Sequence, residues 1–162
     1  SARVTAANTS SQGGGTIGTD IFLVFTADTD NGSFVREVQF VPTATAPTTT
    51  TATVGRVFIS TQTSGSTTSS NTFFYREIAL PATAADNATT AAPYYTIPIG
   101  FVVPAGYSIL VTNHAAPAAN TAWKAVVIAI SRSTRLSPSS DRCRPPAPWQ
   151  QAPNFATSRK SN

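Results

Sequence analysis

Charged residues are scarce in this chain of 162 residues, at 11% of the sequence, and methionine is absent. The polar character of the chain therefore rests on threonine, serine, asparagine and glycine. Threonine, serine and asparagine compete with the backbone hydrogen bonds of a helix, whereas threonine and valine suit a pleated strand. The composition argues against a helical fold and favours β-sheet.

A single cysteine, Cys143, excludes an intrachain disulfide, so the fold must be stable through packing alone. No apolar run reaches the roughly 18 residues that a membrane-spanning helix needs, and the start of the sequence lacks the layout of a signal peptide. We expect a soluble chain with no membrane partner. Its length suits one domain with a proper core.

Catalytic residues are also few. The sole histidine, His114, follows an expected strand, and Asp28 and Asp30 lie in a turn beside Asn31 and Gly32, where such residues occur for structural reasons. These residues do not form the nucleophile, base and acid of a hydrolase. We expect no enzyme activity.

Metal and phosphate sites lack their usual patterns. One histidine and one cysteine do not supply three or four zinc ligands at a known spacing, and the aspartates are not arranged as a calcium loop. The glycine-rich stretch Gly13 to Gly18 lacks the lysine and hydroxyl residue of a phosphate-binding loop and precedes a strand. We therefore expect no cofactor.

Short apolar segments with a period of two predict strands. In the second segment we expect Phe34, Val38 and Phe40 to share a face, and in the fourth Phe74, Ile78 and Leu80. Asn31-Gly32 is typical of a hairpin turn between the first two segments. The seven segments are Asp20 to Ala27, Ser33 to Val41, Val54 to Thr61, Asn71 to Leu80, Tyr94 to Val103, Tyr107 to Asn113 and Ala122 to Ser131.

The chain divides into three parts. Residues 1–16 are small and polar and predict a flexible N-terminal leader. Residues 17–131 predict an all-β domain, an antiparallel β-sandwich of about seven or eight strands, for which a jelly-roll or immunoglobulin-like arrangement fits best. Residues 132–162 contain five prolines and predict an extended C-terminal arm, because proline cannot donate a hydrogen bond to a central strand.

The basic excess lies in that arm. Residues 1–131 carry five basic and six acidic side chains, and residues 132–162 carry six basic side chains and one acidic, which gives net charges of −1 and +5. The basic residues are too scattered for the tracking of phosphates, so we do not expect nucleic acid as a partner. The arm instead suits docking on a protein. Its expected contact residues are the anchors Trp149 and Phe155 and the basic residues Arg142, Arg144, Arg159 and Lys160.

Four stretches of the expected domain occur in a fixed order: "IGTDIFLVFTADTDNGSFVREVQFVPTAT", "RVFIST", "FFYREIALPAT" and "FVVPAGYSILVTNHAA". In these stretches, over about Thr16 to Ile130, the sequence resembles a family of small bacteriophage virion proteins. The resemblance implies a jelly-roll-like domain on the exterior of a capsid, acting as a decoration (cement) protein, with a tail-fibre or head-spike module as the alternative. It also implies the major capsid protein as partner, and it carries over no catalytic residue. Because many identical contacts add through avidity on a symmetric shell, we expect a homotrimer.

A receptor-binding module remains a rival interpretation. Such a module would use the threonine- and serine-rich loops and exposed aromatic side chains to bind a host glycan or surface protein. The candidate aromatic residues are Tyr75, Tyr94, Tyr95, Tyr107 and Trp123. Most of them alternate with core positions, which favours packing over ligand binding.

Overall fold

The computed structural model describes residues 1–45, 48–85 and 92–131. Within these residues every regular element is a β-strand, and all pairings between the named strands are antiparallel. The twelve strands are β1 (Ala2–Val4), β2 (Gly15–Thr16), β3 (Phe22–Thr26), β4 (Ser33–Ala44), β5 (Thr48–Thr49), β6 (Thr53–Ser60), β7 (Ser66–Thr67), β8 (Thr72–Leu80), β9 (Ala84–Ala85), β10 (Tyr95–Val103), β11 (Ser108–Asn113) and β12 (Thr121–Ser131).

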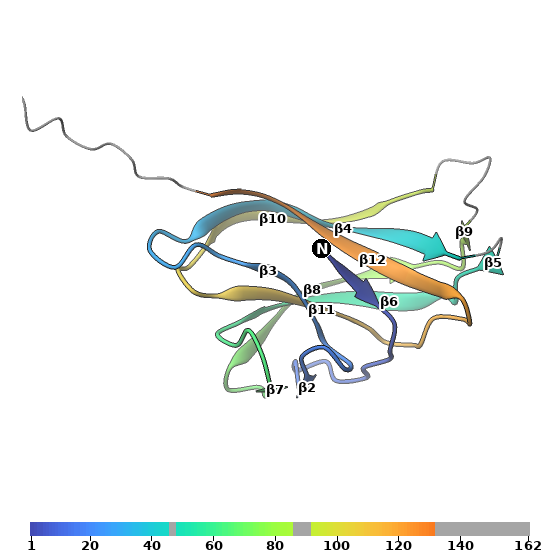
Figure 1. Cartoon of the computed structure of the whole chain (residues 1–162), viewed down its shortest axis with the longest axis horizontal. Coiled ribbons are helices and arrows are strands. Elements are labelled where there is room, and N and C mark those ends of the chain that lie inside the picture. Colours follow the sequence, from blue (N-terminus) through green and yellow to red (C-terminus); the bar gives the residue numbers. More distant parts are fainter. Residues whose placement is uncertain (46–47, 86–91, 132–162) are drawn as a thin grey trace, which may run out of the picture.

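Eight of these strands form two four-stranded sheets that pack as two layers (Figure 1). Sheet A has the order β1-β12-β4-β10, and sheet B has the order β3-β11-β6-β8. Of the two short pairs, β5–β9 lies at the right-hand end of the layers in Figure 1, and β2–β7 lies below sheet B. The predicted antiparallel β-sandwich is confirmed.

The main core fills the space between the two sheets. Trp123 of β12 is fully buried there and packs edge-to-face on Tyr95 of β10, with ring centroids 5.6 Å apart. Large apolar side chains of this kind supply most of the favourable free energy of folding when they leave water. Other fully buried members of the core are Val35, Val38, Phe40, Val57 and Ile109.

The seven predicted segments correspond to β3, β4, β6, β8, β10, β11 and β12. One connection differs from the prediction. The turn at Asn31 and Gly32 does not close a hairpin, because β3 belongs to sheet B and β4 to sheet A. The turn therefore carries the chain from one layer to the other.

Two bulges change the predicted faces. On β4, Glu37 pairs with Ile128 and Val35 pairs with Ala129, which leaves Arg36 as an extra residue. A bulge of one residue reverses the alternation beyond it. Phe34 thus lies on the face opposite to Val38 and Phe40, contrary to the prediction.

The second bulge has the same effect on β8, where Tyr75 is the extra residue between Phe74 and Arg76. Phe74 packs on Phe58, with ring centroids 5.8 Å apart, whereas Ile78 packs against the main core. The predicted sharing of a face by Phe74 and Ile78 is therefore wrong.

The prediction of a flexible leader over residues 1–16 is also wrong. β1 pairs with β12 at the edge of sheet A, and Val4 is fully buried in the main core. The chain then crosses to sheet B, where Ala7 forms a parallel bridge with Asn113 and the backbone N–H of Asn8 donates to the carbonyl of Asn113 at 2.7 Å. These residues are an integral part of the sandwich.

The following residues cover the outer face of sheet B. Ile21, Phe58 and Leu110 form a second buried cluster there, against which Ile17 and Leu23 pack. The glycines allow the backbone to lie directly on the sheet, since a β-carbon at Gly13 would come within 3.2 Å of Phe58. At Gly13 and Gly15 the absence of a side chain, which suggested flexibility, is instead a requirement of close packing.

Candidate functional site

The outer faces of the two sheets differ. Residues 8–21 cover part of sheet B, whereas no described segment crosses the outer face of sheet A (Figure 1). On β12 the alternate residues Trp123, Ala125 and Val127 point into the core. The alternate residues on the other side of the strand therefore lie on this open face. They are Lys124, Val126, Ile128 and Ile130.

One end of the open face is apolar. Ile130 of β12 pairs with Phe34 of β4, and Phe34 pairs with Val102 of β10, so the three side chains form a row across three strands. Ile130 is 66% exposed, Val102 38% and the neighbouring Ile128 37%. We call Phe34, Val102, Ile128 and Ile130 the apolar strip; contiguous exposed apolar side chains of this kind mark interaction surfaces.

The turn that precedes β4, at the strip end of sheet A, is acidic. Asp28 and Asp30 belong to the turn before Ser33, and Ser33 pairs with Val103 and Ser131 at this end of sheet A. Backbone N–H groups of Asn31 and Asp30 donate to Asp28 Oδ1 at 2.9 and 3.0 Å. These bonds lower the pKa of Asp28, with the Asn31 bond contributing most, so this carboxylate is charged at neutral pH.

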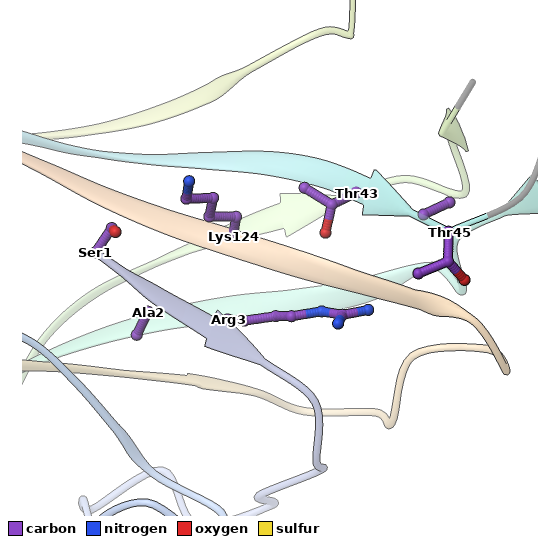
Figure 2. A pocket seen from close by; sticks show the side chains of 7 residues that line it. Ser1, Ala2, Arg3, Thr43, Thr45 and Lys124 are labelled. Atoms are coloured by element: carbon purple, nitrogen blue, oxygen red, sulfur yellow. The ribbon is translucent and has the colours of Figure 1, made fainter. Parts of the chain in front are cut away.

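The other end of the open face is basic. Arg3 of β1 pairs directly with Lys124 of β12, and both side chains are exposed. They line a shallow pocket of about 480 Å³ together with residues that include Thr43 and Thr45 (Figure 2). Among the described residues neither cation has an acidic partner. Like charges directly opposite on paired strands repel each other, so an anionic group from a partner would be stabilised here.

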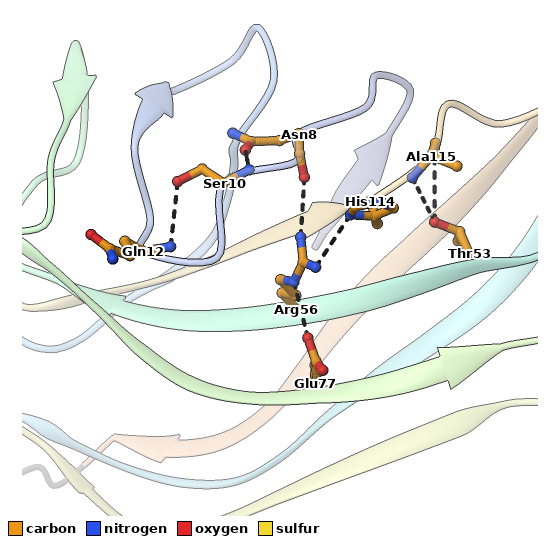
Figure 3. Close-up of polar contacts among 8 residues, drawn as sticks. All are labelled: Asn8, Ser10, Gln12, Thr53, Arg56, Glu77, His114 and Ala115. Carbon is orange, nitrogen blue, oxygen red and sulfur yellow. Dashed lines mark hydrogen bonds and ion pairs between the residues drawn. The ribbon is translucent and has the colours of Figure 1, made fainter.

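A polar cluster on sheet B ties the N-terminal segment to the sandwich (Figure 3). Arg56 is 8% exposed, and its Nε donates to Glu77 Oε2 at 3.0 Å. Its two terminal nitrogens donate to the carbonyl of Asn8 at 3.3 Å and to His114 Nδ1 at 3.2 Å. Because arginine can only donate, Nδ1 of His114 accepts this hydrogen bond. The cluster thus has a structural role.

The described part of the chain holds neither a metal centre nor a membrane-spanning helix. Within residues 1–45, 48–85 and 92–131, no three histidine, cysteine, aspartate or glutamate side chains gather in a way that could hold a metal ion. In the same residues no helix is long and apolar enough to cross a bilayer.

The aromatic residues with a possible role in ligand binding have different environments. Trp123 is buried, and Tyr95 packs on it. The hydroxyl of Tyr75 on β8 donates to the carbonyl of Pro98 on β10 at 3.1 Å, which joins the edges of the two sheets. Tyr94, at 66% exposed, is the most open of the described tyrosines.

The partner-binding residues predicted from the sequence lie outside the described residues. These are Arg142, Arg144, Trp149, Phe155, Arg159 and Lys160. The sequence did not reveal the pair of Arg3 and Lys124, because residues 1–16 gave no strand signal. The only indication in the sequence was the apolar Val4 beside Arg3.

Comparison of the chain with protein-family models, with curated proteins and with solved structures found no match in any of the three. The function is therefore argued from the geometry of the chain itself.

Proposed function

We propose that this chain is a non-enzymatic structural protein of a bacteriophage virion, a capsid decoration (cement) protein that binds the outer surface of the assembled shell. Its partner is the major capsid protein, and it acts as a homotrimer on the capsid exterior. The C-terminal residues 132–162 grip neighbouring subunits. We further propose that its sandwich is a jelly roll.

The strand order carries this proposal. If the eight sheet strands are numbered in chain order, the first pairs with the eighth, the second with the seventh, the third with the sixth and the fourth with the fifth. This is the pattern of one long hairpin wound into two sheets. Jelly rolls of eight strands are common among viral capsid domains.

The open face of sheet A adds a second line of support. It combines exposed apolar side chains with Arg3 and Lys124, which have no acidic partner among the described residues, and such a mixture suits a protein partner with acidic groups. A ligand that binds only the assembled shell stabilises the shell by mass action. Several identical contacts from one trimer would add through avidity.

The test is co-sedimentation of the purified full chain with DNA-free shells of the phage that encodes it. We expect the wild type to sediment with the shells, and the double variant Arg3→Glu, Lys124→Glu to bind at least tenfold more weakly. Arg76→Glu is the matched control, since Arg76 is an exposed cation on sheet B. Absence of the wild-type chain from the shell pellet would overturn the proposal.

The alternative is a tail-fibre or head-spike module that binds a host receptor or glycan. Jelly rolls also occur in lectins, and the exposed Tyr94 offers an aromatic surface of the kind that sugars contact. Deletion of residues 132–162 separates the two functions. It should abolish shell binding by a cement protein and leave host-cell binding by a receptor module unchanged.

A further inference from the structure

We infer that the apolar strip of sheet A is the docking site for residues 142–162 of a second copy of this chain. This inference deepens the proposed function and rests on the part of it in which the C-terminal residues grip a neighbouring subunit. It names the surface that receives them.

The strip and the C-terminal residues both offer apolar side chains to a contact. Phe34, Val102 and Ile130 lie side by side on adjacent strands, so the row extends about 10 Å across the sheet at the usual strand spacing. The sequence after Ser131 holds two aromatic residues, Trp149 and Phe155. Large aromatic side chains are the usual anchors of an interface, and the row is wide enough to accept one of them.

The charge of residues 142–162 also favours the strip. Residues 142–162 contain four basic side chains and no acidic one. The turn with Asp28 and Asp30 lies at the strip end of sheet A, and Arg3 and Lys124 lie at the other end. Beside the strip on β4, Arg36 and Glu37 carry opposite charges 3.6 Å apart and add no net charge. A basic segment is thus attracted to the strip and repelled from the basic pocket, which selects its position on the open face.

The direction of β12 and the number of residues after it favour a second copy as the source of the docked segment. β12 ends at Ser131, one residue beyond Ile130, and from there its direction leads away from its own strip. Arg142 follows Ser131 by eleven positions, which span at most about 40 Å when fully extended. This reach suffices for an adjacent copy, whereas docking on the same copy requires the chain to reverse. A contact of this head-to-tail type closes into a ring in a trimer.

The test uses Cys143, the sole cysteine, which lies next to Arg142. The full-length variant Val102→Cys places a second thiol on the strip, and Ala79→Cys places one at an exposed position of sheet B as the matched control. Both proteins are oxidised under mild conditions and analysed on non-reducing gels, and mass spectrometry of peptides identifies the linked cysteines. No shells are added, so the result does not depend on capsid binding.

For Val102→Cys we expect covalent oligomers up to the trimer, linked between positions 102 and 143, at a yield at least fivefold above that of Ala79→Cys. Addition of Ile130→Lys, at a largely exposed position, removes an apolar contact and adds a charge that repels the basic segment, so it should reduce this yield at least fivefold without loss of folding. Equal yields from the two cysteine variants would overturn the inference. A 102–143 link within one chain would overturn the assignment to a second copy. If the chain is cross-linked as expected but does not sediment with shells in the separate binding experiment, the proposed capsid role is refuted and the docking inference stands.

Discussion

Gly13 lies so close to Thr72 that a β-carbon on the glycine would be 2.5 Å from Thr72 Cγ2. This contact presses the N-terminal segment onto sheet B beside Phe58. The glycine-rich stretch resembles a linker in sequence, but this contact makes it a fixed part of the fold.

Replacement of this glycine should be costly. Gly13 has φ of 79°, a conformation that strains any other residue, and the added methyl group would collide with Thr72. We expect Gly13→Ala to lower the free energy of unfolding by about 2–4 kcal/mol in urea denaturation.

Two neighbouring glycines serve as controls for that variant. Gly18 has φ of 89°, but a β-carbon there would meet no atom within 4 Å, so Gly18→Ala reports backbone strain alone, about 1–2 kcal/mol. Gly14 has no positive φ, and a β-carbon there would not collide with a neighbour, so Gly14→Ala should be neutral or slightly stabilising. A Gly13→Ala protein as stable as Gly14→Ala would show that the contact with Thr72 is not rigid.

Two buried threonines of sheet B should respond in opposite ways to loss of the hydroxyl group. Thr112 Oγ1 has no hydrogen-bond partner among the described residues, whereas Thr72 Oγ1 bonds Ser60 Oγ at 2.8 Å and donates to Asn71 Oδ1 at 3.0 Å. Thr112→Val should raise the free energy of unfolding by about 1 kcal/mol, and Thr72→Val should lower it by about 1–2 kcal/mol. Thermal unfolding of the two variants measures the difference, and destabilisation by Thr112→Val would contradict the expectation.

The two ion pairs of the described residues should differ in their contributions. Glu77→Gln removes the charge that compensates the buried Arg56, and we expect a loss of about 1–3 kcal/mol in the free energy of unfolding. Glu37→Gln is the control, because its partner Arg36 is largely exposed to water. Arg36 Nε lies 3.6 Å from Glu37 Oε2. The effect of Glu37→Gln should stay below about 0.5 kcal/mol. Chemical denaturation at one salt concentration compares the variants, and equal losses would refute the assigned role of Arg56.

The sequence was sufficient for the regular strands because their alternation is local. It also placed Val38 and Phe40 on one face, as the structure has them. It failed at Phe34 and Phe74, since a bulge is defined by the partner strand and leaves no local trace. The strip and the pair of Arg3 and Lys124 likewise depend on register between distant strands, which no single segment encodes.

The pairing of β1 with β12 also has a consequence for folding kinetics. Ala2 and Ala125 are cross-strand partners although 123 positions separate them in the chain. Folds dominated by such distant pairings form slowly, typically in milliseconds to seconds, because the loop entropy is lost before the contacts form. During synthesis β1 emerges before the other strands of the sandwich but cannot take its place until β12, the last of them, has left the ribosome.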